Sequence, residues 1–142
     1  MPFDLAALFI CTGLTPVVLF HLYWASGGRK GADLVIPTRP KDGTKLFEPK
    51  PLATLSVAAF LVAMGLLAAS KWFGQPLVVS AQALSWLQMG AGVIFSARAL
   101  GDFHHIGFSK RVRGTPFAWW DDRLFSPFVL MIGIAFFILA WE

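Results

Sequence analysis

Residues 98–127 read RALGDFHHIGFSKRVRGTPFAWWDDRLFSP and join two long apolar runs. They carry five of the twelve Lys and Arg residues, three of the eight acids and two of the three histidines. Aromatic and aliphatic residues are interleaved with these charges along the whole segment, as is typical of polypeptide at a membrane–water interface. We therefore expect this segment to lie at a membrane surface and to hold the functional site.

The composition of the whole chain indicates an integral membrane protein. The 142 residues are 56% hydrophobic and 14% charged, whereas a soluble domain carries about 25% charged residues. Four apolar runs approach or exceed the roughly 17–25 residues needed to cross a hydrocarbon core about 30 Å thick. We predict one all-α domain, residues 1–142, that forms a bundle of four transmembrane helices. The expected spans are at about 5–25, 51–70, 77–100 and 124–141, with an interfacial segment between the third and fourth.

The distribution of Lys and Arg predicts the topology. Six of them lie in residues 27–50 and five in residues 98–123, whereas the connector between spans two and three contains only Lys71. By the positive-inside rule, the two basic connectors face the cytoplasm and both termini lie outside. The net charge of +4 does not indicate nucleic-acid binding, because these basic residues flank apolar runs, where they suit anionic lipid.

The one cysteine, Cys11, excludes a disulfide within these residues and a metal site made of cysteines alone. A cleavable signal peptide is not expected, because Asp4 and no Lys or Arg precede the first apolar run. We expect neither a cofactor nor a metal ion. The competing interpretation joins His104 or His105 with His21 as ligands of haem or a divalent ion.

Local patterns predict how the segments begin and pack. Three prolines and four glycines argue against a helix in residues 27–50. Ser126-Pro127 resembles an N-cap followed by proline at the first helical position, so the last helix should begin there. Arg98 and Asp102 have the spacing of a helical ion pair, unless Gly101 ends the helix between them. Four polar or small residues of the third span share one face and should pack against another helix, namely Ser85, Gln88, Gly92 and Ser96.

The predicted topology brings most polar side chains to the cytoplasmic leaflet and leaves the outer half of the bundle almost without ionisable groups. Guanidinium and ammonium groups make charge-assisted bonds to phosphate or carboxylate, and apolar helix faces can hold a tail. We therefore predict a ligand site at the ends of spans one and three and the third connector. Its residues are His21, Trp24, Arg98, Asp102, Lys110, Arg111 and Asp122.

Three functions fit such a site. We favour binding or transport of a small anionic or amphiphilic ligand, with membrane lipid as the partner and no nucleic acid. The first alternative is a membrane-embedded enzyme that uses His21 or Asp102 as acid–base groups, although the chain lacks a Walker loop, an HExxH motif and a CxxC motif. The second is an accessory subunit of a larger membrane complex. Each of the three functions is compatible with a homo-oligomer.

Five segments carry a family resemblance: HLYWASGG (21–28), RALGDF (98–103), GFSKRV (107–112), TPFA (115–118) and DRLFSP (122–127). They resemble a family of small bacterial four-span membrane proteins catalogued as domain of unknown function 3995, and the resemblance covers essentially the whole chain. It implies four helices in a bacterial inner (cytoplasmic) membrane and no established activity. It also implies that five residues belong to the family's pattern, which favours a site over a random basic loop: Arg98, Asp102, Lys110, Arg111 and Asp122.

Overall fold

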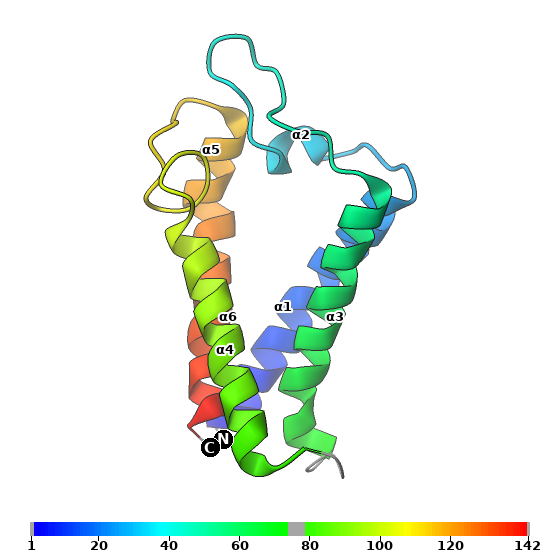
Figure 1. The fold of residues 1–142 in the computed structure, drawn as a ribbon, viewed down its shortest axis with the longest axis vertical. Helices are drawn as coiled ribbons and strands as arrows, with labels where there is room; N and C mark the ends of the chain where they lie inside the picture. The colour runs from blue at the N-terminus through cyan, green and yellow to red at the C-terminus, as the bar shows by residue number, and fades with distance from the viewer. Residues whose placement is uncertain (1, 74–78, 142) are drawn as a thin grey trace.

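The computed structural model describes residues 2–73 and 79–141, and within them the chain forms helices and no strand. Figure 1 shows two helix pairs, α1 beside α3 and α4 beside α6, which lie close together near the two termini and diverge toward the other end. The connector after α1 crosses between the pairs at that open end. The elements are α1 (Pro2–Ala25), α2 (Ala32–Val35), α3 (Pro51–Phe73), α4 (Ala81–Leu100), α5 (Pro116–Trp120), the π-helix η1 (Asp121–Phe125) and α6 (Ser126–Ala140).

Three of the helical segments are long and apolar enough to cross a membrane: Pro2–Ala25, Pro51–Ser70 and Pro116–Ala140. The sequence prediction of an all-helical protein with membrane-like helices is confirmed in the described residues. Helix α4 is not in this group, because polar residues such as Gln88 and Arg98 interrupt its apolar sequence. The predicted start of that span at residue 77 lies outside the described residues, and the helix itself begins after Ser80, whose Oγ accepts a hydrogen bond from the N–H of Ala83.

Helices α4 and α6 approach closely because small residues line their contact. A Cβ atom placed on Gly133 would lie 2.7 Å from Ser96 Oγ and 3.0 Å from the carbonyl oxygen of Gly92. Ser85 Oγ donates a hydrogen bond to the carbonyl oxygen of Ala140 at 2.6 Å. The predicted packing face of this helix is therefore confirmed, and it follows the rule that small and hydroxyl-bearing residues let helices in an apolar environment pack tightly.

Aromatic rings connect the two helix pairs at mid-height. Phe95 on α4 stacks on Phe136 of α6, with ring centroids 5.7 Å apart, and lies 6.3 Å from the ring of Phe60 on α3. Ile10 of α1 and Ile132 of α6 are fully buried in the same core. The core thus holds the pairs together below the open end, where the charged connectors lie.

The last long helical segment begins earlier than predicted. Thr115 is its N-cap, with Oγ1 accepting from the N–H of Ala118 at 3.1 Å, and Pro116 follows at the first helical position. The helical segment thus starts before Ser126-Pro127, whereas the regular α-helix α6 does begin at Ser126, as predicted. Ser126 is not its N-cap, because η1 leads into α6 in helical conformation. Proline has no N–H and its ring crowds the carbonyl four residues back. The chain accommodates Pro127 with a π-turn, in which the N–H of Ser126 reaches the carbonyl oxygen of Asp121.

The connector of residues 27–50 contains one short helix, α2, although its prolines and glycines argued against any. Gly31 precedes α2 with φ of +78°, a conformation that glycine adopts without steric cost. Helix α2 contacts α5, and Ile36, directly after α2, is buried. The connector therefore links the two helix pairs at their diverging end.

Candidate functional site

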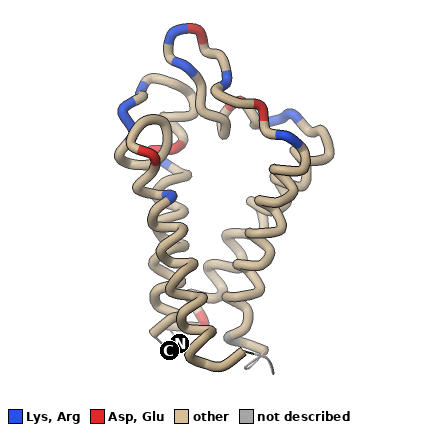
Figure 2. The backbone as a smooth tube through the Cα atoms, viewed as in Figure 1, with Lys and Arg blue, Asp and Glu red and all other residues tan. Residues whose placement is uncertain are grey.

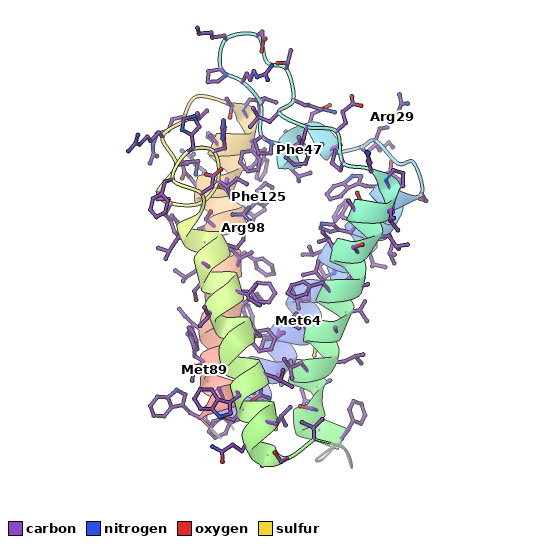
Figure 3. The ribbon with its side chains drawn as sticks, viewed as in Figure 1. Arg29, Phe47, Met64, Met89, Arg98 and Phe125 are labelled. Atoms are coloured by element: carbon purple, nitrogen blue, oxygen red, sulfur yellow. The ribbon has the colours of Figure 1, made fainter. Side chains whose placement is uncertain are left out.

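Basic side chains gather at the end of the molecule opposite the two termini. Figure 2 shows Lys and Arg concentrated in the connectors of residues 27–50 and 101–115 at that end. Arg98 lies in the last turn of α4, and Figure 3 shows it near the upper end of that helix.

A tight loop follows α4 and is organised by Asp102. The helix ends at Gly101, which has φ of +91°. Asp102 Oδ1 accepts three backbone hydrogen bonds, from the N–H groups of His104 (2.9 Å), His105 (2.6 Å) and Ile106 (2.8 Å). Asp102 thus lies beyond the helix, and the predicted helical ion pair between Arg98 and Asp102 is wrong, whereas Gly101 is confirmed as the helix end.

The environment of Asp102 keeps its carboxylate ionised. Partial burial raises the pKa of Asp102, but the three N–H groups outweigh that effect and lower the pKa to about 2. A carboxylate with so low a pKa is a poor proton acceptor at neutral pH. The geometry therefore gives Asp102 a role in shaping the loop and does not favour it as the acid–base group of an enzyme.

The centre of the site is Asp121, at the start of the π-turn, and its side chain is fully buried. Its Oδ1 accepts a hydrogen bond from Arg98 Nη2 at 3.1 Å. Its Oδ2 accepts from Lys110 Nζ at 3.0 Å and from the backbone N–H of Gly107 at 2.7 Å. One carboxylate thus joins α4, the third connector and η1.

Lys110 is fully enclosed by its partners. Its Nζ donates to the carbonyl oxygen of Gly107 (2.9 Å), to Asp121 and to Asp122 Oδ1. An ammonium group has three donors, so all of them are used inside the protein. Asp122 Oδ2 in turn lies 3.3 Å from Arg113 Nη1. Lys110 and Asp122, predicted as ligand-binding residues, are here members of an internal ion-pair network with Arg98, Asp121 and Arg113.

Arg98 differs from Lys110 because one of its nitrogens is unused. Nη2 is bonded to Asp121, but Nη1 is buried and has no hydrogen-bond partner in residues 2–73 and 79–141. Figure 3 shows Arg98 and Phe125 at the same level near the upper end of the α4–α6 pair. Buried polar atoms are nearly always bonded, so this nitrogen is an exception among the described residues, together with Ser126 Oγ.

The remaining predicted site residues lie apart from this network. His21 Nδ1 lies 2.8 Å from the carbonyl oxygen of Val17, and Trp24 Nε1 donates to the carbonyl oxygen of Lys30 at 2.9 Å. The two rings are 5.4 Å apart. No hydrogen bond or ring contact in the described part of the chain joins His21 or Trp24 to Arg98 or Asp121. Arg111 is exposed on the third connector.

The two histidines of the third connector contact each other edge to face. The rings of His104 and His105 are 4.3 Å apart, and His105 Nδ1 lies 3.7 Å from Asp102 Oδ2. Among the described residues, no group of three or more His, Cys, Asp or Glu side chains is placed to hold a metal ion. The joint site of His21 with His104 or His105 has no contact that supports it.

Sequence reasoning missed Asp121, the residue on which the network depends. The sequence does contain a hint, because two adjacent acids follow two tryptophans in an otherwise apolar segment. Which of the two acids is buried depends on the helix register, and the π-turn changes that register. Asp121 faces inward and is fully buried, whereas Asp122 is half-buried.

Comparison with known proteins gives one match. The model of a family described as "Protein of unknown function (DUF3995)" matches residues 14–136, which confirms the resemblance read from the sequence. No curated protein and no solved structure matches the chain.

Proposed function

The chain belongs to the DUF3995 family, and from that premise we propose that it is a four-span protein of a bacterial cytoplasmic membrane that binds or transports a small amphiphile with an anionic head. The ligand head binds at the cytoplasmic end, on Arg98. The observation that carries this proposal is the buried, unpartnered Nη1 of that arginine.

The four-span topology is supported by how α4 is covered. Its polar face lies against α6, where Ser85 is bonded to Ala140 and Ser96 lies close to Gly133. Polar groups of a membrane helix are tolerated when neighbouring helices satisfy them. Figures 1 and 2 show both termini at one end of the molecule and the basic connectors at the other. With α4 as the fourth span, the two ends would lie on opposite sides of the membrane. The positive-inside rule makes the basic side cytoplasmic.

The charges of the network favour an anionic ligand. Three cations, Arg98, Lys110 and Arg113, face two acids, Asp121 and Asp122. The network therefore carries one surplus positive charge. A buried donor without an acceptor costs about 1–3 kcal/mol, and more if it is charged. A phosphate or carboxylate oxygen on Nη1 would remove that cost and make a charge-assisted bond.

The other predicted residues divide into two roles in this proposal. Asp102, Lys110 and Asp122 fix the third connector and so hold Arg98 and Asp121 in place. His21 and Trp24, on the opposite helix pair, and the exposed Arg111 are candidates for contacts with the rest of the ligand.

The test is native mass spectrometry of the protein released from a mild detergent. The wild-type protein should retain a discrete anionic amphiphile. Arg98→Lys keeps one cation beside Asp121 but removes the second nitrogen, so this variant should lose the adduct while remaining folded. Arg29→Gln, which changes an exposed arginine at the same end, should keep it. A wild-type protein without an adduct, or equal retention by Arg98→Lys, would refute the proposal.

The topology has its own test. A reporter fused to the C-terminus that is active only outside the cytoplasm should be active. An inactive reporter, together with activity of a cytoplasmic reporter at the same position, would contradict the predicted orientation with both termini outside, without bearing on Arg98 as a binding group.

A further inference from the structure

We propose a second anion site, separate from Arg98 Nη1, that binds a phosphate group between Arg113 and Arg123. A shallow, open hollow of about 450 Å³ lies where the third connector enters the last long helix. The residues that matter in its lining are Arg113, Thr115, Trp119, Asp122 and Arg123. None of the arginines in this lining was among the residues predicted from the sequence.

Both arginines line the hollow, although they come from different segments. Gly114 has φ of +81° and lies between Arg113 and the N-cap Thr115. Arg113 thus precedes the helix, while Arg123 is carried by η1, two turns further along. Arg123 is held by Trp119: its Cζ lies 4.3 Å from the centre of the indole ring. A cation over an aromatic face is attracted to it and loses freedom to move away.

Both guanidinium groups keep donors that are free for a ligand. Arg113 contributes Nη1 to its ion pair with Asp122, and its side chain is 62% exposed. Arg123 has one long contact, 3.5 Å from Nη1 to the carbonyl oxygen of Trp119. An arginine has five N–H donors, so most of them on each side chain point to solvent or to the hollow.

The acid in the lining is already neutralised. Asp122 is bonded to Lys110 as well as to Arg113. Arg123 contacts Trp119 and has no ion pair among the described residues, so it adds an uncompensated positive charge to the lining. Two planar guanidinium groups that line one open depression match the several oxygens of a phosphate group, which can accept paired N–H bonds from each.

The position of the hollow decides which phosphates can reach it. It lies at the basic end of the Pro116–Ala140 segment, and Trp119 beside it is 49% exposed. Exposed tryptophan at the end of a membrane-length helix is typical of the headgroup level. The phosphate of a lipid headgroup and free phosphate from the cytoplasm share the required chemistry.

The experiment uses the protein in micelles of a maltoside detergent, which contains no phosphate, with nuclear magnetic resonance of the Gly114 amide and the Trp119 indole N–H. One arm adds phosphatidylglycerol to the micelles, and the other adds inorganic phosphate to a phosphate-free buffer. We expect saturable shifts at both positions in at least one arm. Saturation with phosphatidylglycerol alone identifies a lipid headgroup, and saturation with inorganic phosphate identifies a soluble ligand.

Two double variants distinguish specific binding at the hollow from nonspecific attraction by positive charge. The double substitution Arg113→Gln and Arg123→Gln should weaken the apparent affinity about tenfold or more, since each lost charged bond corresponds to about a tenfold change. The double substitution Arg29→Gln and Arg39→Gln removes the same charge from the first connector and should change the affinity less than about twofold. Equal losses in both double variants, or linear shifts that do not saturate, would overturn the proposal.

Two further variants keep the result interpretable. If the double glutamine variant does not fold, Arg113→Lys and Arg123→Lys take its place. Both retain the positive charge and should keep part of the wild-type affinity. The Arg98 proposal is read from whether Arg98→Lys retains the adduct, whereas this one is read from Gly114 and Trp119 in variants of Arg113 and Arg123, which line the hollow. Failure of the Arg98 proposal and failure of this one are therefore distinguishable.

Discussion

The ammonium group of Lys110 and the carboxylate of Asp121 lie 3.0 Å apart, and neither side chain is exposed. The contact connects the third connector to the π-turn, and Arg98 extends it to α4. Taking two charges out of water is costly unless their remaining donors and acceptors are also satisfied. Here the backbone of Gly107 supplies both kinds of partner, an acceptor for Lys110 and a donor for Asp121.

Removing Asp121 should be among the most destabilising single changes in the chain. Asp121→Ala leaves Arg98 without its acid and Lys110 with one carboxylate in place of two. Breaking a buried pair in this way costs about 3–5 kcal/mol. Asp121→Asn should cost less, because the amide oxygen still accepts a hydrogen bond. The measurement is thermal unfolding in a mild detergent, with the exposed Asp42→Ala as control; a similar midpoint for both alanine variants would contradict the role of Asp121.

The two glycines that flank the third connector should respond differently to alanine. Both have positive φ, +91° at Gly101 and +81° at Gly114. A Cβ at Gly101 would lie 1.7 Å from the carbonyl oxygen of Ile106, whereas at Gly114 it would meet nothing within 4 Å. Gly114→Ala should therefore cost only the left-handed strain of about 1–2 kcal/mol. Gly101→Ala should cost clearly more, measured as the fraction of folded protein and its unfolding midpoint, and equal costs would show that the loop can move away.

The close contact between α4 and α6 predicts a size limit at Gly133. An added methyl group there would collide with Ser96 and with the carbonyl oxygen of Gly92. Overpacking of this kind costs about 1–3 kcal/mol. Gly65 lies in α3 with nothing within 4 Å of the corresponding position, so Gly65→Ala is the matched control and should be neutral or slightly stabilising. Unfolding midpoints of the two variants that do not differ would mean that the helices separate without cost.

The stability of the loop after α4 should depend on pH, because Asp102 must be ionised to hold the loop. Its pKa of about 2 lies below the value of about 3.9 for an unfolded aspartate. A lowered pKa in the folded state stabilises the loop above about pH 4, and this stabilisation is lost as the pH falls through about 2. The amide proton shifts of His104, His105 and Ile106 should titrate together with a midpoint near that lower value.

The control for this titration is Asp102→Asn, which cannot ionise and should remove the transition from all three amides. A midpoint near pH 4 in the wild-type protein would show that the three backbone hydrogen bonds do not hold the carboxylate.

Several features could be read from the amino acids because they depend on local composition and spacing. Long apolar runs predict long helices whatever their partners are, and the polar face of α4 recurs at helical spacing, so its packing on another helix could be expected. The count of Lys and Arg in each connector likewise requires no knowledge of the fold. The motifs of the third connector were specific enough to indicate the family that matches residues 14–136.

The arrangement of the site could be determined only from the tertiary structure. Two Thr/Ser-Pro pairs, Thr115-Pro116 and Ser126-Pro127, offer the same start signal, but only Thr115 caps a helix, because η1 leads into Ser126 in helical conformation. Arg98 had a neighbour four residues away in Asp102, yet its partner is Asp121, 23 residues away. Spacing along the sequence favours a partner that is close in the chain. In the folded protein, a buried charge pairs with the opposite charge that the packed helices bring within reach. Helix register and loop closure decide which charge that is, and no short segment of sequence contains this information.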